Sequence, residues 1–467
     1  MGHPFVILAL GIGIVVGAIL ILRINAFVAL ITAALAVSLC APGALDQKIT
    51  RVAVEFGATA GKIGIVIAFA AVIGDCLTRS GAADRIVRFL MRLLGERRAP
   101  AALMASGFVL SIPVFFDTIF YLLLPLARST HRRTGIRYLL LILAMGAGAS
   151  ITHSMVPPTP GPLILADIFK IDLGIMIMFG LAASLPTAVV IYCFVVWWSR
   201  KFDIPMRPLA SALPEPEPLP DAQLPGLFAA SLPITLPVLL ISLNTFASSL
   251  AKLPEGGKDF ARLAEITAIV GNPNLAMLCS AVIAAAVLAR RRKPGRAAMA
   301  RLVESSLSSA GLIILITSAG GAFGAMLKEA RIGDSVEQMF SASGGALGGM
   351  KLLLAAFLVA FVIKFAQGSS TVAMLTAGAM MAALIGAPET LGFHPVYVAL
   401  AIGWGAQCGN WMNDSGFWVF AKMGGLTEVE ALKTWTVTVS LTAVVGLAVT
   451  MTRSEEHTSE LQSRGLI

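Results

Sequence analysis

Long apolar segments alternate with short polar stretches along nearly the whole chain. In the first half they occupy residues 4–22, 26–45, 62–78, 99–127, 138–170 and 174–198. The second half repeats the arrangement at residues 225–246, 267–289, 311–327, 350–387, 396–421 and 434–452. About 20 apolar residues in a helix cross the hydrocarbon core of a bilayer. The pattern therefore predicts an all-α polytopic membrane protein.

Two of these segments are predicted to be re-entrant hairpins. Residues 99–127 have arginines beyond both ends, so the segment enters and leaves on one side, and Pro113 and Asp117 interrupt its middle. Residues 350–387 are interrupted in the same way by polar residues at 367–371. Irregular backbone is tolerated at membrane depth only where protein or water surrounds it. We therefore expect both tips to lie inside the protein.

Two further segments are predicted to be discontinuous helices. Residues 138–170 contain HSMVPPTPGP at 153–162, whose four prolines prevent a continuous helix. Residues 396–421 contain the polar stretch CGNWMNDS at 408–415. Each half of the chain then has two irregular segments, one hairpin and one broken helix.

The order of segments predicts an internal duplication. Each half has five crossings and one hairpin, and an odd number of crossings puts the halves in opposite orientations. At an offset of 250, Gly61 and Gly74 recur as Gly311 and Gly324. We predict two inverted repeats of five transmembrane helices plus one re-entrant hairpin each, at 1–200 and 225–452. Inverted repeats with broken helices at the midplane are typical of secondary transporters.

The remaining segments are predicted to lie outside these repeats. Residues 201–224 are rich in proline and charge, which favours an extended cytoplasmic linker. Residues 453–467 begin RSEEHTSELQS, which resembles a translated sequencing adapter and predicts a non-native tail. A short disordered polar tail is the alternative.

Composition supports the membrane assignment and excludes other classes. Hydrophobic residues make up 57% and charged residues 13%, too few charges for a soluble enzyme of 467 residues. The net charge of +9 comes from arginine clusters between apolar segments, which keep loops cytoplasmic and do not indicate a nucleic-acid partner. The five cysteines form no close pair. We expect no cofactor and no enzyme activity.

Polar side chains at the four interruptions are the candidate binding residues. Such groups are costly inside a membrane and are functional candidates for that reason. Half-helices that begin at a break also direct N–H groups toward it, which suits a carboxylate. We expect a small hydroxylated monocarboxylate, bound by Thr118, Thr152, Thr159, Ser369, Ser370, Thr371, Asn410, Asn413 and Ser415.

Three titratable residues at the interruptions are candidates for proton coupling. These are Asp117, His153 and Asp414. Each has a structural alternative: Asp117 neutralised by a neighbouring backbone amide or hydroxyl, His153 satisfied by a carbonyl, and Asp414 solvated near a cytoplasmic end. Asp75 and Lys364 lie near segment ends and are expected to extend their charge to the membrane surface. Sodium coupling and a passive anion channel or facilitator are the alternatives to proton coupling.

Four motifs resemble a known family. They are IPVFFDTIFYLLLP at 112–125, THSMVPPTPGP at 152–162, AQGSSTVA at 366–373, and NDSGFW at 413–418 with KTWT at 433–436. Together they resemble the gluconate permease family of gluconate:proton symporters, in the ion transporter superfamily. The resemblance implies inverted repeats, elevator-type movement, and proton-coupled uptake of sugar acids and related hydroxy acids across a bacterial inner membrane. Many members have His where Thr159 stands, which implies a different substrate preference. Elevator transporters commonly form homodimers, so a homodimer is also expected.

Overall fold

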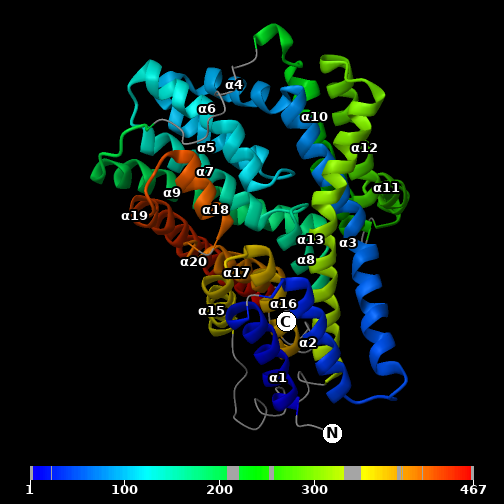
Figure 1. The fold of residues 1–467 in the computed structure, drawn as a ribbon. Coiled ribbons are helices and arrows are strands. Elements are labelled where there is room, and N and C mark those ends of the chain that lie inside the picture. Colours follow the sequence, from blue (N-terminus) through cyan, green and yellow to red (C-terminus); the bar gives the residue numbers. More distant parts are fainter. Residues whose placement is uncertain are drawn as a thin grey trace.

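Every regular element in the described part of the chain is a helix (Figure 1). The computed structural model describes residues 4–22, 24–207, 220–251, 257–330, 349–385, 391, 393–412 and 414–463. Within these ranges the chain forms no β-strand. The predicted all-α class is therefore confirmed.

Seven helical spans are long and apolar enough to cross a membrane. They match seven of the ten predicted crossings and cover 47–80, 138–168, 173–201, 227–248, 273–292, 296–329 and 428–454. The other three crossings correspond to shorter apolar helices, α1 (Pro4–Val16), α2 (Ala26–Cys40) and α17 (Val396–Gln407). These seven spans establish the multi-pass character of the protein.

Two long helices run along one side of the molecule. Helices α3 (Gln47–Ser80) and α13 (Arg296–Glu329) each have 34 residues and pack against one another (Figure 1). Their contact is close where residues are small: a Cβ at Gly64 would lie 3.5 Å from the Ile314 side chain. Helix α2 packs on α13, and α12 (Pro273–Arg292) packs on α3.

Four of the apolar segments are interrupted helices. The first-half pairs are α5 (Ala99–Leu110) with α6 (Phe116–Thr134) and α7 (Tyr138–Met155) with α8 (Pro160–Ile168). In the second half, α15 (Gly349–Gln367) is followed by α16 (Ser370–Ile385), and α17 by α18 (Ser415–Trp418) and a π-helical turn, η6 (Val419–Met423). In Figure 1, α5 and α6 lie toward one end of the molecule and α15 and α16 toward the other.

The helix predicted at 267–289 is interrupted near its start. The structure has two helices there, α11 (Gly257–Val270) and α12. Gly271 separates them and lies against α10 (Leu227–Ala251), where a Cβ would be 2.4 Å from the Leu240 carbonyl oxygen. Asn272 then caps α12 by accepting from the Asn274 amide at 3.0 Å, and Pro273 occupies its first turn. The apolar pattern continues across this break, so periodicity alone does not reveal it.

The linker is anchored at both ends. Arg207 donates to the two carboxylate oxygens of Glu430 at 2.5 and 2.7 Å. At the other end Asp221 forms ion pairs with Arg88 and Arg92 of α4 (Ala82–Leu94). Residues 208–219, at the centre of the predicted linker, lie outside the described residues. Helix α20 (Val437–Ser463) continues past residue 453, and the non-native tail stays a prediction.

Candidate functional site

The first hairpin meets the second interrupted helix. The ring of Phe116, at the start of α6, stacks on Trp435 with centroids 5.4 Å apart. It also lies 3.5 Å from the position of a Cβ at Gly416, in α18. Trp435 Nε1 donates to Asn410 Oδ1 at 3.3 Å. These contacts hold the α6 end of the first hairpin beside the break between α17 and α18.

The second hairpin meets the first interrupted helix in a matching way. Helix α16 packs on α8, and a Cβ at Gly161 would lie 2.3 Å from the sulfur of Met374. One helical turn further on, Gly378 faces Leu165, with 2.7 Å between a Cβ at Gly378 and the leucine side chain. Small residues on both helices permit this approach.

The two interrupted helices also contact each other. Gln407, the last residue of α17, donates from Nε2 to Ser150 Oγ on α7 at 2.9 Å. A Cβ at Gly403 would lie 3.1 Å from the carbonyl oxygen of Ser154. All four helix breaks therefore belong to one contiguous region, which we call the junction. It comprises residues 111–116, 150–161, 364–371 and 407–417.

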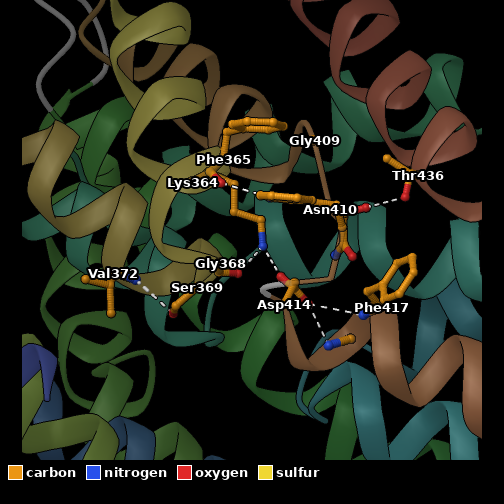
Figure 2. Close-up of polar contacts among 12 residues, drawn as sticks. Lys364, Phe365, Gly368, Ser369, Val372, Gly409, Asn410, Asp414, Phe417 and Thr436 are labelled. Carbon is orange, nitrogen blue, oxygen red and sulfur yellow. Dashed lines mark hydrogen bonds and ion pairs between the residues drawn. The ribbon is translucent and has the colours of Figure 1, made fainter. Parts of the chain in front are cut away.

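A buried ion pair lies at the junction (Figure 2). Lys364 Nζ donates to Asp414 Oδ2 and to the carbonyl oxygen of Gly368. Lys364 is 0% exposed and Asp414 8%. The other oxygen of Asp414 accepts from the amides of Gly416 at 2.5 Å and Phe417 at 3.3 Å, so it caps α18.

The expectation that Lys364 extends to the membrane surface is wrong. Helix α15 ends at Gln367, so the Gly368 carbonyl is available within reach of the lysine side chain. Asp414 supplies the compensating charge from a different interrupted helix. The sequence did contain a signal for this buried cation, because Lys364 lies three residues before the predicted hairpin tip at 367–371. Its partner is 50 residues away in sequence, and no local pattern points to it.

The threonines of the first interrupted helix donate to backbone. Thr152 Oγ1 donates to the Phe108 carbonyl of α5 at 2.8 Å, which joins the hairpin to the helix. Thr159 Oγ1 donates to the Val156 carbonyl at 2.7 Å, within the break. Both side chains are buried. Each hydroxyl retains lone pairs that can accept a hydrogen bond.

The second-half candidates surround the ion pair to different degrees. Asn410 is 9% exposed, and its backbone carbonyl oxygen accepts a hydrogen bond from Thr436 Oγ1 at 2.5 Å. Ser369 is exposed, and its Oγ accepts from the Val372 amide at 3.4 Å. Ser370 and Thr371 are half-buried in the first turn of α16. The structure thus brings Asn410 and Asp414 close to the second hairpin tip.

The remaining candidates lie mainly at the first hairpin. Thr118 is half-buried in the first turn of α6, directly after Asp117. The side chains of Asp117 and Ser415, and all of Asn413, lie outside the described residues.

Two polar side chains at the junction have an atom without a partner among the described residues. These atoms are His153 Nδ1 and Gln407 Oε1, and both are buried. The carbonyl partner considered for His153 is not observed at Nδ1; its ring instead lies edge-on to Phe115, at 6.1 Å between centroids. Sequence reasoning did not select Gln407, although it directly precedes a predicted break. Buried polar atoms are normally hydrogen-bonded, so these two unpaired atoms are exceptions that call for an explanation.

Apolar helices that break together around buried polar groups define a multi-pass membrane transporter. The chain matches the description "GntP family permease" over residues 3–454, and it belongs to that family. A gluconate permease of Pseudomonas aeruginosa is 31% identical over 452 residues, covering 96% of this chain and 97% of the relative. The high-affinity gluconate transporter of Escherichia coli is 29% identical over 447 residues, covering 95% and 98%.

A solved transporter shares the fold. MtrF of Neisseria gonorrhoeae aligns with a TM-score of 0.65 at 18% identity. Its structure is reported as illuminating a class of antimetabolite efflux pumps. The alignment covers 91% of this chain and 93% of MtrF. The chain is thus a permease and not an enzyme, and it is a multi-pass protein of the inner membrane.

Proposed function

We propose that the protein imports a small hydroxylated monocarboxylate, gluconate or a related sugar acid, by proton-coupled symport. The observation that carries the proposal is the fully buried Lys364 at the junction, because a buried cation provides the counter-charge for a carboxylate. The names of the gluconate-transporting relatives support the same substrate class. Coupling to protons requires a group that titrates at the site, and Asp117, His153 and Asp414 are the candidates.

The polar residues of the junction, together with Thr118 in the first turn of α6, have separate proposed roles. Asn410, Asn413 and Ser415 would contact the substrate from the second interrupted helix, and Ser369, Ser370 and Thr371 from the second hairpin. Thr118, Thr152 and Thr159 would contact it from the first half. Hydroxyl and amide groups both donate and accept, as the hydroxyls of a sugar acid require.

The proposed transport cycle uses two inverted repeats. Three features support the repeat: helices of equal length in α3 and α13, hairpins that lie apart in Figure 1 with α5 and α6 above α15 and α16, and a broken helix after each hairpin. Such repeats provide alternating access when one part moves against the other. Elevator-type movement and a homodimer remain predictions from the family resemblance.

Uptake into proteoliposomes tests the function. With an acidic exterior, we expect radiolabelled gluconate to accumulate above its external concentration, and a protonophore to abolish the accumulation. Equilibration without accumulation would indicate a passive facilitator. Replacement of sodium by choline at constant pH should change nothing, and a loss of accumulation would indicate sodium coupling. Competition by glycerate, lactate and other hydroxy acids then ranks the substrates, with protein-free liposomes as the control.

A further inference from the structure

The Lys364–Asp414 pair connects two segments that carry different parts of the proposed site. Lys364 belongs to the second hairpin, whereas Asp414 caps the far half of the second interrupted helix (Figure 2). Lys364 also holds the Gly368 carbonyl, and Asp414 also holds two backbone amides. Either residue therefore keeps a backbone partner if their mutual contact is exchanged for another.

The charges of the pair limit which states of the site are stable. With a carboxylate on Asp414 and an ammonium on Lys364, the empty site is neutral. A substrate carboxylate added to that pair would leave a net charge of minus one in a buried environment. Protonation of Asp414 without substrate would leave plus one. Unpaired charge is costly where water is excluded, so substrate and proton together restore neutrality.

We propose that the substrate carboxylate takes the place of Asp414 on Lys364, and that Asp414 carries the coupled proton. This inference rests on the proposed function and assigns its two chemical roles. Outside, water delivers a proton that forms an O–H bond on Asp414, and the Lys364 ammonium transfers its hydrogen bond from Asp414 to the substrate carboxylate. Inside, the substrate leaves, the O–H bond breaks, and Asp414 pairs with Lys364 again. Lys364 keeps all of its protons throughout.

Among the described residues, few other charged groups lie on the helices packed around the pair. Helices α16 and α17, which pack on α15, contain no charged residue. Lys351 lies at the far end of α15, and the charges of α20 begin at Arg453. On the side of α18, η6 carries Lys422, which pairs with Glu428 at 2.6 Å. Helix α7 carries His153, and the sequence of α6 includes Asp117 and Arg128. Arg128 donates a hydrogen bond to the Arg207 carbonyl oxygen at 3.0 Å. Asp117 and His153 are the competing proton carriers.

The unmodified protein provides the first test. Gluconate binding to detergent-purified protein is measured by calorimetry at pH 7 in buffers of different ionisation enthalpy. We expect one proton to be taken up for each gluconate bound. Binding without proton uptake would overturn the proposal, and no variant is needed for that result.

Charge variants test which residue carries each role. Asp414→Asn should bind gluconate without proton uptake, and should exchange gluconate across the membrane while losing accumulation driven by a pH gradient. Lys364→Gln should weaken gluconate binding by roughly 10- to 100-fold, whereas Lys364→Arg should retain binding and its proton uptake. Lys351→Gln on the same helix and Glu428→Gln, whose side chain is half-buried and pairs with Lys422, are matched controls and should behave like the unmodified protein.

Each single variant leaves one buried charge unpaired, which can prevent folding. A double variant without either charge avoids this problem. Lys364→Met with Asp414→Leu removes both charges and should yield a monodisperse protein that binds no gluconate. Proton-coupled accumulation by this double variant, or by Asp414→Asn, would overturn the proposal. A failure of the proposed function can be distinguished from a failure of this inference, because in that case the unmodified protein would not accumulate gluconate at all.

Discussion

Gln407 Nε2 donates to Ser150 Oγ at 2.9 Å and thereby joins the ends of the two half-helices that enter the junction. The two residues are 257 positions apart in sequence, and both are buried. The amide has a second polar atom, Oε1, without a partner among the described residues. This contact therefore joins the two broken helices and leaves the Oε1 acceptor of Gln407 unpaired among the described residues.

Ser150→Ala should destabilise the protein. The variant leaves the Gln407 amide without its partner, and a buried unsatisfied polar group costs about 1–3 kcal/mol. The melting temperature of detergent-purified protein measures the effect. Ser309→Ala is the matched control, because Ser309 is exposed and bonds to the carbonyl of Ser305 in its own helix. An equal melting temperature for both variants would show that the contact is not stabilising.

Gln407→Met combined with Ser150→Ala should recover most of the lost stability. Replacing both partners by apolar groups of similar size removes the unsatisfied atom. If Oε1 accepts from a substrate hydroxyl, the double variant should nevertheless bind gluconate more weakly by roughly 5- to 30-fold. Recovered stability with unchanged gluconate affinity would exclude Gln407 from the binding site.

Gly148→Ala should disrupt the packing of the first hairpin. A Cβ at Gly148 would lie 2.1 Å from the carbonyl oxygen of Met104, so α7 and α5 would have to separate. Overpacking of this kind costs about 1–3 kcal/mol. Gly61→Ala on α3 has no atom within 4 Å of the new Cβ and should be neutral or stabilising, because alanine favours helix. The melting temperatures of the two variants measure this difference in stability. Equal melting temperatures would contradict the prediction that only Gly148→Ala disturbs the packing.

Thr152→Val separates a structural role from a binding role. The isosteric change removes the bond to the Phe108 carbonyl and should lower stability by about 1–3 kcal/mol. Thr187→Val is the control, since Thr187 is also buried but bonds to the Ala183 carbonyl in its own helix. If Thr152→Val raises the KM for gluconate and leaves the melting temperature unchanged, the residue acts on the substrate instead.

The anchor at Asp221 should depend on pH. The hydrogen bond from Arg88, with the added charge of Arg92, holds the pKa of Asp221 below its usual value. Because the folded pKa is lowered, the stabilisation is present above the ordinary Asp range, near pH 3.9, and is lost as pH falls through the folded pKa. Asp221→Asn should therefore lower the melting temperature slightly at pH 7, with a difference from the unmodified protein that disappears on acidification. The exposed Asp203→Asn is the matched control.

Much of the helical order follows from local sequence. Apolar length fixes where a helix can cross, and proline, glycine and polar clusters fix where it breaks. The breaks at 111–115 and 156–159 follow from Pro113 and the PPTPGP stretch. The separation of α11 from α12 also has a local signal, because Asn272 caps α12 and Pro273 fits its first turn, but the apolar pattern alone does not detect it.

By itself, the sequence determined an all-helical membrane protein with polar helix interruptions, since both depend on the local balance between apolar length and backbone hydrogen bonding. Only the tertiary structure decided which polar groups meet. Lys364 near a segment end reads as a lysine that reaches the membrane surface, yet packing of the hairpin against the broken helix seals it from water and pairs it with Asp414. From the sequence, Gln407 is likewise only the last residue of a helix. The structure places Ser150 of α7 beside it as a hydrogen-bond partner. Charge pairing and burial depend on neighbours distant in sequence, and those neighbours are specified only by the packed fold.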